Sequence, residues 1–198
     1  MSAPLPIAVL ISGGGTTLRN LIERIQDGSL PVEIRVVISS NPVAKGLQFA
    51  EAAGLKSTVV EKKKELTDAA FSEAIFEPCR AASAQYVVMG GFLKHVFIPP
   101  DFQNRVINIH PARLPKFGGK GMYGLKVHEA VIAAGERVSG CTVHFVDNEY
   151  DHGPVILQRQ VSVLPGDTPA TLQARVFAAE CEAYPQVLRS LAGKADVT

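Results

Sequence analysis

Hydrophobic and polar positions along the chain alternate between two patterns, one typical of strands and one of helices. Segments rich in Val and Ile are followed by stretches with helical spacing, and Gly, Pro, Ser or Asn stand at the boundaries. Strands are expected at Pro6–Ser12, Val32–Ser39, Lys56–Glu61 and Gln85–Met89, and helices at Thr16–Asp27, Ala44–Ala53 and Thr67–Ala82. Because several of these strands are apolar almost throughout, a parallel sheet covered on both faces is predicted.

The second half of the chain has a different pattern. It predicts a strand at Arg105–Ile109, a helix at Tyr123–Ala134, strands at Gly140–Val146 and Val155–Val161, a helix at Pro169–Leu191 and a frayed tail at Gly193–Thr198. The last two strands are too close for a parallel crossover, so they are expected to be antiparallel. The expected fold class is therefore α/β: a Rossmann-like open twisted sheet, parallel in its N-terminal half and mixed in its C-terminal half, with helices on both faces.

Composition narrows the classes of function. The 198 residues include 20 Lys plus Arg against 19 Asp plus Glu, a formal charge of +1, so no broad field exists to attract nucleic acid or a membrane. The start MSAPLPIAVLISGGG lacks a secretory signal and no apolar run spans a bilayer, which predicts a cytoplasmic protein. Three cysteines, an odd number without close pairing, are expected to be buried, unreactive thiols. No linker divides the chain, and one domain over residues 1–198 is expected.

Three glycines separate the first expected strand from the first expected helix. Gly15 is the last of them, and Thr16 and Thr17 add hydroxyl groups. A glycine turn before a helix suits an anion, because backbone amides and the positive end of the helix face it. No Lys follows as in a Walker loop, and Leu18 replaces the third glycine of a dinucleotide fingerprint. One phosphate is the preferred ligand, and a bare structural turn is the alternative.

The segment RVINIHPARLP ends an apolar strand with two polar side chains. Asn108 and His110 share one face because side chains alternate along a strand. They are expected at the carboxyl edge of the sheet, where ligands of open α/β folds bind. Asn supplies a neutral donor for an oxyanion and His transfers protons, a pairing that suits acyl transfer. The alternative is an Asn in a turn and a His that fills a polar gap.

An acidic turn, VDNEYDHGPVI, joins the last two expected strands. Asp147 and Glu149 are expected to be merely solvated. Asp151 precedes the His–Gly–Pro that re-enters the sheet, and we expect it to orient and charge a histidine of the neighbouring strand. The five histidines show no metal-ligand spacing, so no metal site is expected.

Four segments in order, ISGGGTT, VVMGGFLK, INIHPARLPKFGGKG and VHFVDNEYDHGPVILQ, resemble the phosphoribosylglycinamide formyltransferases, also called glycinamide ribonucleotide transformylases, of the folate-dependent formyltransferase family. The resemblance covers nearly the whole chain. It implies transfer of the formyl group of 10-formyltetrahydrofolate, a co-substrate, to the amine of glycinamide ribonucleotide in purine synthesis, without a metal. It also implies a phosphate-binding half at about 1–90 and a folate-binding, catalytic half at about 91–198.

The resemblance assigns a role to each matching residue. Asn108 and His110 are expected to stabilise the tetrahedral oxyanion, and Asp151 to hold the imidazolium. Gly15, Thr16 and Thr17 are expected to bind the substrate phosphate, and Glu180 to contact the amine side of the substrate. The residues expected to bind folate are Met89, Gly90, Gly91, Phe92, Leu93, Lys94, His95, Val96 and Asn148.

Several positions depart from the commoner family pattern. Lys94 stands where Arg is frequent, His95 where an aliphatic residue is common, and Phe177 where Lys or Gln is frequent; the stretch Phe117–Lys126 is longer than in some members. The resemblance implies small-molecule partners, no nucleic acid or membrane, and a monomer or weak homodimer. The alternatives are methionyl-tRNA formyltransferase and formyltetrahydrofolate hydrolase, whose extra domains are not expected here, and a non-catalytic nucleotide-binding module.

Overall fold

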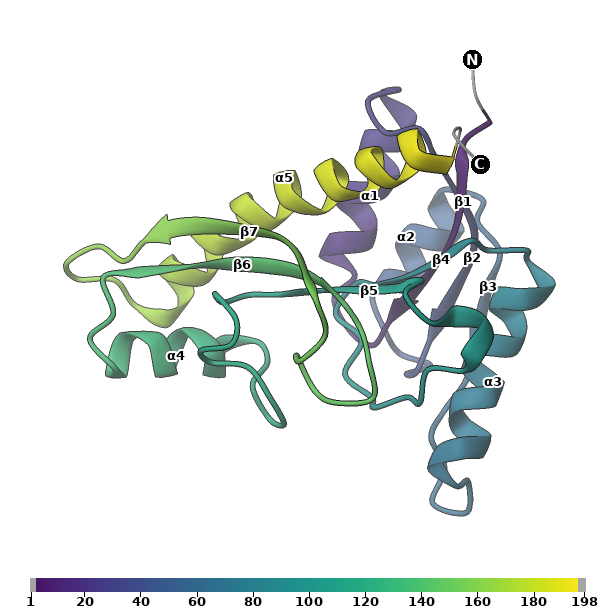
Figure 1. The fold of residues 1–198 in the computed structure, drawn as a ribbon, viewed down its shortest axis with the longest axis horizontal. Helices are drawn as coiled ribbons and strands as arrows, with labels where there is room; N and C mark the ends of the chain where they lie inside the picture. The colour runs from purple at the N-terminus through teal and green to yellow at the C-terminus, as the bar shows by residue number, and fades with distance from the viewer. Residues whose placement is uncertain (1–2, 196–198) are drawn as a thin grey trace. The chain divides into compact units, whose positions relative to one another are not determined.

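The computed structural model describes residues 3–195, with seven strands and six helical segments among them (Figure 1). The strands are β1 (Leu5–Ile11), β2 (Val32–Ser39), β3 (Ser57–Val59), β4 (Tyr86–Met89), β5 (Val106–His110), β6 (Val138–Phe145) and β7 (Val155–Ser162). The helices are α1 (Thr16–Gln26), α2 (Gly46–Ala52), α3 (Asp68–Ala81), the 3₁₀ segment η1 (Pro100–Phe102), α4 (Leu125–Ala133) and α5 (Pro169–Ala195).

The strands form a mixed sheet in the order β3-β2-β1-β4-β5-β6-β7. β1 pairs in parallel with both β2 and β4, and β2 pairs in parallel with β3. β6 and β7 are antiparallel, and Figure 1 shows them running side by side. The predicted fold class, an open α/β sheet with a parallel first half and a mixed second half, is confirmed.

The chain divides into two compact units. The first unit consists of the residues up to Ile107 together with those from Leu188 onward. The second unit is Asn108–Val187. In the first unit the middle of β1 is completely buried, and the rings of Phe76 on α3 and Phe102 pack 5.1 Å apart. In the second unit Val127 and Val131 on α4 and Cys141 and Val143 on β6 are fully buried.

Most expected elements are present, with shifted ends. The third strand is only Ser57–Val59 instead of Lys56–Glu61, and β6 begins at Val138 instead of Gly140. The short η1 helix was not predicted, since three residues are too few for a periodic pattern. The prediction of a frayed tail at Gly193–Thr198 is wrong for residues 193–195, because α5 continues to Ala195. Residues 196–198 lie outside the described part of the chain.

The cysteines follow the expectation in two of three cases. Cys79 and Cys141 are buried, and burial raises the pKa of each thiol to about 12, so both remain protonated and unreactive. Cys181 is only partly buried, which corrects the expectation for that residue. It lies on α5 one position after Glu180, where the helix is not completely covered.

Candidate active site

The end of β5 carries the first two predicted site residues. Asn108 and His110 are two positions apart on the strand, and the neighbouring Ile107 and Ile109 are buried. The His110 ring is also buried, although it is polar. Buried polar groups are usually paired, and two different loops bring an oxygen atom near each ring nitrogen: one is a hydrogen-bond acceptor and the other belongs to a carboxylate.

Both ring nitrogens of His110 face oxygen atoms that accept hydrogen bonds. Nε2 lies 2.8 Å from the backbone carbonyl oxygen of Phe117, and Nδ1 lies 3.4 Å from Oδ2 of Asp151. A carbonyl only accepts, so Nε2 carries a proton in this arrangement. When Nδ1 is protonated as well, the positively charged ring donates on one side to the carbonyl and is paired on the other with the carboxylate.

Asp151 is held in place by the loop that follows β5. Its Oδ2 accepts a hydrogen bond of 2.9 Å from the backbone N–H of Gly119, and a Cβ on Gly118 would lie 3.1 Å from the Cβ of Asp151. Asp151 and Phe117 both have left-handed backbone conformations, with φ of 53° and 58°. Such conformations are uncommon outside glycine and gather at functional sites.

Asn108 is oriented by His144, a residue that was not predicted to belong to the site. His144 is buried near the end of β6, and its Nδ1 lies 2.8 Å from the Phe145 carbonyl, which only accepts. Burial lowers the pKa of His144, so the ring is neutral and Nε2 has a free lone pair. Asn108 Nδ2 lies 3.3 Å away and donates to it. The same Nε2 lies 3.8 Å from Oδ1 of Asp151, so these groups form one cluster.

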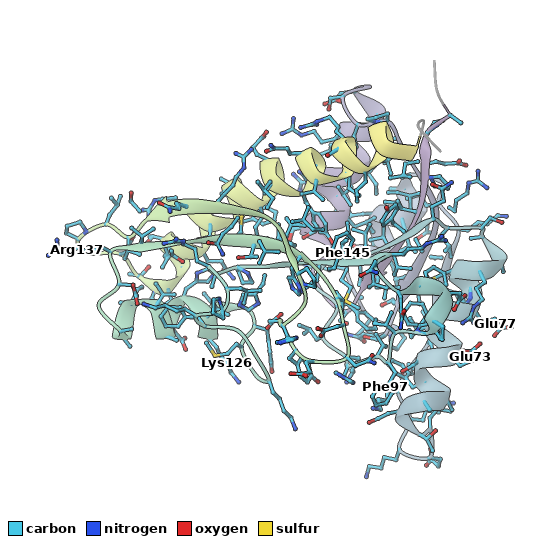
Figure 2. All side chains as sticks on the ribbon, viewed as in Figure 1. Glu73, Glu77, Phe97, Lys126, Arg137 and Phe145 are labelled. Atoms are coloured by element: carbon cyan, nitrogen blue, oxygen red, sulfur yellow. The ribbon has the colours of Figure 1, made fainter. Side chains whose placement is uncertain are left out.

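Figure 2 labels Arg137, just before β6, and Phe145, its last residue, at opposite ends of that strand. The cluster therefore lies at the carboxyl end of β6 as well as that of β5. Thr142 lies two positions before His144 and fixes the chain beyond His110: its Oγ1 donates to the carbonyl of Ala112 and accepts from the N–H of Leu114. A buried hydroxyl of β6 thus fixes the path of the chain directly after His110.

The other acidic residues of the β6–β7 turn behave differently from Asp151. Asp147 accepts a hydrogen bond of 2.8 Å from Nδ1 of the exposed His152, and its Oδ1 accepts one from the N–H of Glu149. The bond to Asp147 raises the pKa of His152. Asp147 therefore stabilises the turn through two hydrogen bonds, whereas it was expected to be merely solvated. Asn148 is exposed on the same turn.

Glu180 lies on α5 and is partly exposed, and no hydrogen bond or ion pair to its carboxylate exists among the described residues. Surrounding protein atoms desolvate the carboxyl group and raise its pKa from 4.5 to about 8. It also acts electrostatically on Cys141 of β6, which raises the pKa of that thiol. An unpaired carboxyl group with so perturbed a pKa is characteristic of functional sites.

In the first unit, the glycine turn forms the N-terminal end of α1 as predicted. Gly15 has φ of 70°, and a Cβ there would lie 2.3 Å from the Cα of Gly46, so only glycine fits. Gly14 and Thr16 are exposed, and Thr17 is partly buried. Among residues 3–195, no side chain caps the N-terminal end of α1. A helix end without a side-chain cap leaves backbone amides for another acceptor, as an anion site requires.

The segment Met89–Val96 lies beside this turn within the same unit. A Cβ on Gly90 would lie 3.4 Å from the Cβ of Thr17, and the N–H of Leu93 donates to the Oγ of Ser12 at 2.9 Å. Lys94 is exposed, and the ring of His95 meets that of Phe97 edge to face at 5.2 Å. The backbone here is irregular and partly accessible, as expected for a segment that contacts a ligand.

Within residues 3–195, no three His, Cys, Asp or Glu side chains gather in a way that could hold a metal ion. In the same range, no helix has the length and apolar composition needed to cross a bilayer.

Comparison with known proteins now defines the class. A family model described as formyl transferase matches residues 5–188, and the chain belongs to this family. The resemblance noted in the sequence is thereby confirmed.

Among curated relatives, the phosphoribosylglycinamide formyltransferase of Haemophilus influenzae is 34% identical over 187 residues, covering 92% of this chain and 85% of that protein. The chloroplastic phosphoribosylglycinamide formyltransferase of Arabidopsis thaliana is 37% identical over 190 residues, or 93% of this chain. The chain spans 64% of the length of that plant protein and 60% of the Vigna unguiculata one.

A solved structure shares the fold closely. The crystal structure of glycinamide ribonucleotide transformylase 1 from Symbiobacterium toebii has a TM-score of 0.89 and 36% sequence identity, and the match covers 98% of this chain and 90% of that one.

Proposed function

We propose that the chain transfers the formyl group of 10-formyltetrahydrofolate to the amine of glycinamide ribonucleotide. The observation that carries the proposal is the cluster at the ends of β5 and β6, in which His110 lies between Asp151 and the Phe117 carbonyl while His144 orients Asn108. A neutral amide donor beside an imidazole that is paired with a carboxylate suits acyl transfer. A module that only binds nucleotides needs no such group.

Formyl transfer proceeds by attack of the amine nitrogen on the formyl carbon. The new C–N bond converts the formyl oxygen to an oxyanion, and the tetrahedral intermediate collapses when its bond to the folate nitrogen breaks. The amine loses one proton and the folate nitrogen gains one. Asn108 donates one amide N–H to His144, and its second N–H has no partner among the described residues, so this N–H is available to the oxyanion.

His110 is the second oxyanion donor and the residue through which a proton moves. Its Nε2 donates to the Phe117 carbonyl in this structure, so the oxyanion must replace that carbonyl as the acceptor. Asp151 keeps the ring oriented and offsets its positive charge from the other side. The strained backbone at Phe117 and Asp151 fits a site that is held in one conformation.

The substrate phosphate binds at Gly15, Thr16 and Thr17. The proposal is supported by the N-terminal end of α1, which lacks a side-chain cap, and by the left-handed Gly15, where a side chain would collide with Gly46. The folate contacts the segment Met89–Val96, of which Gly91 to His95 are exposed or partly exposed, and Asn148, which is exposed.

Glu180 contacts the amine side of the substrate. With a pKa of about 8, its carboxyl group is mostly protonated at neutral pH in the absence of ligand. An approaching ammonium favours the carboxylate, which then accepts a hydrogen bond and takes part in an ion pair. The carboxylate can then take one proton from the ammonium, which leaves a neutral, nucleophilic amine beside a protonated Glu180.

We also propose that the protein is cytoplasmic, acts on small molecules without nucleic acid, membrane or metal, and is a monomer or weak homodimer. The near-zero formal charge of +1 supports the absence of a polyanionic partner.

The test is to mix the protein with 10-formyltetrahydrofolate and glycinamide ribonucleotide and to follow folate deformylation optically. We expect deformylation that requires the nucleotide and yields stoichiometric formylated product by mass spectrometry. Deformylation that proceeds equally without the nucleotide, with release of formate, would instead establish a hydrolase. Saturable nucleotide binding without deformylation would establish a binding module.

A further inference from the structure

The second unit contains a cavity of about 240 Å³ that none of the proposed roles uses. One wall is the segment after β5, from Arg113 to Phe117, and the other includes Val138 and Ser139 at the start of β6. Val138 and Ser139 lie at the end of β6 next to Arg137, which Figure 2 labels. The cavity shares Phe117 with the cluster around His110, but Asn108, His110, His144 and Asp151 do not line it.

The polar groups of the cavity leave donors unfilled. Arg113 is anchored by one hydrogen bond, from its Nε to Oε1 of Gln158 at 3.3 Å, and its two terminal nitrogens have no partner among the described residues. Gln158 is itself fixed, since its Nε2 donates to the Leu114 carbonyl and to Thr142 Oγ1. Ser139 is 2% exposed, and its buried hydroxyl has no hydrogen-bond partner within residues 3–195. Buried polar atoms without partners are uncommon.

The charges of the cavity favour an anion. Lys116 and Glu136 both line it and are paired with each other at 2.8 Å, so their charges offset. Arg113 forms no ion pair in the described part of the chain, which leaves one net positive charge on a side chain held in place by Gln158. The two terminal nitrogens of a planar guanidinium form one edge that matches the geometry of a carboxylate.

The other residues that line the cavity, and its volume, indicate what a bound anion carries besides its charged group. Leu114, Pro115, Phe117 and Val138 supply apolar surface beside the charged group. A volume of about 240 Å³ is below the ~300–1,000 Å³ of pockets for drug-sized ligands. We propose that this cavity binds a small organic carboxylate, whose acid group meets Arg113 and whose apolar body lies against Leu114 and Phe117. The inference goes beyond the proposed function and does not depend on it.

Occupancy of the cavity is transmitted to the catalytic imidazole through one residue. Phe117 lines the cavity. Its carbonyl oxygen accepts the hydrogen bond from His110 Nε2. Phe117 has a left-handed backbone with φ of 58°, so its carbonyl direction is confined to a narrow conformational range. A ligand that contacts Phe117 therefore changes the environment of the His110 ring.

The test uses 3-fluorobenzoate as the probe and fluorine NMR of the full chain as the readout. We expect saturable binding that Arg113→Gln weakens at least fivefold and that Lys120→Gln leaves unchanged, because Lys120 is an exposed cation of the same loop outside the cavity lining. The neutral 3-fluorobenzamide, of nearly the same size, should bind at least fivefold more weakly. Equal binding by wild type and Arg113→Gln overturns the proposal.

Methyl and imidazole NMR signals locate the probe without any assay of turnover. The Leu114 and Val138 methyl signals should shift on addition of 3-fluorobenzoate, whereas those of Leu18, buried on α1, should not. The ring signals of His110 should move with the same concentration dependence. Binding that leaves Leu114 and Val138 unperturbed places the probe elsewhere and overturns the proposed site, and an unmoved His110 at saturation overturns the link through Phe117.

Discussion

His110 Nδ1 and Asp151 Oδ2 lie 3.4 Å apart, although 41 positions of sequence separate the residues that bear them. The imidazole comes from the end of β5 and the carboxylate from the turn between β6 and β7. The other ring nitrogen lies against the Phe117 carbonyl, so the pair is fixed from both sides. This relationship underlies the proposed chemistry and is the first to test.

Replacing Asp151 by Asn should remove the charge that offsets the imidazolium while keeping the side chain's shape. Turnover is expected to fall roughly a thousandfold or more, with the fold and much of the ligand affinity retained. Steady-state kinetics of folate deformylation measure the effect. Asp147→Asn is the matched control, since Asp147 belongs to the same turn but bonds to the exposed His152. Similar turnover in both variants would falsify the role assigned to Asp151.

Replacing His144 by Leu should leave the Asn108 amide without its hydrogen-bond acceptor. The oxyanion donor is then free to rotate, and kcat is expected to fall roughly 10- to 100-fold with little change in KM. His152→Leu, an exposed histidine of the neighbouring turn, serves as the control and should have nearly wild-type kinetics. A loss confined to KM would show that His144 affects substrate binding and not the orientation of Asn108.

Glu180→Gln should change how stability depends on pH. The folded carboxyl group has a pKa of about 8 against an ordinary 4.5, so the folded state binds a proton more tightly than the unfolded state. The wild type therefore loses stability as pH rises from about 4.5 to about 8, and Gln cannot ionise. Near pH 7 the variant should be more stable by about 2 kcal/mol, allowing for partial solvent exposure, and near pH 4 it should match the wild type.

Urea unfolding across this pH range, with Glu149→Gln as an exposed control, measures the effect of Glu180. A stability difference that is the same at pH 4 and pH 7 would contradict the raised pKa. The same variant should bind the amine substrate more weakly, because it cannot form the ion pair.

Gly15→Ala should destabilise the protein more than Gly28→Ala does. Both glycines have positive φ, 70° and 78°, but a Cβ on Gly15 would lie 2.3 Å from the Cα of Gly46 whereas one on Gly28 meets nothing within 4 Å. The expected loss is about 1 kcal/mol for Gly28→Ala and about 2–4 kcal/mol for Gly15→Ala. Denaturant midpoints provide the comparison, and equal losses would mean that the turn can shift to accept a methyl group.

The sequence by itself determined the succession of strands and helices, because each element's period of apolar residues is a local property of the chain. It also placed Asn108 and His110 on one strand face and a glycine turn before α1. The same alternation places His144 on the strand face of the buried Thr142, two positions earlier, and this spacing is the sequence signal that indicates His144. The η1 helix and the ends of β3 were not predicted, because an element of three residues is too short to show a periodic pattern of apolar positions.

Only the tertiary structure decided which groups meet. The contact of His110 with the Phe117 carbonyl involves a main-chain atom, and main-chain atoms leave no trace in side-chain patterns. The raised pKa of Glu180 and the lowered pKa of His144 both arise from desolvation by burial, which exists only in the folded protein. The unfilled donors of Arg113 and Ser139 are likewise visible only once β6, β7 and the loop after β5 are packed. Burial and contact are properties of the folded chain, whereas periodicity is already present in the unfolded one.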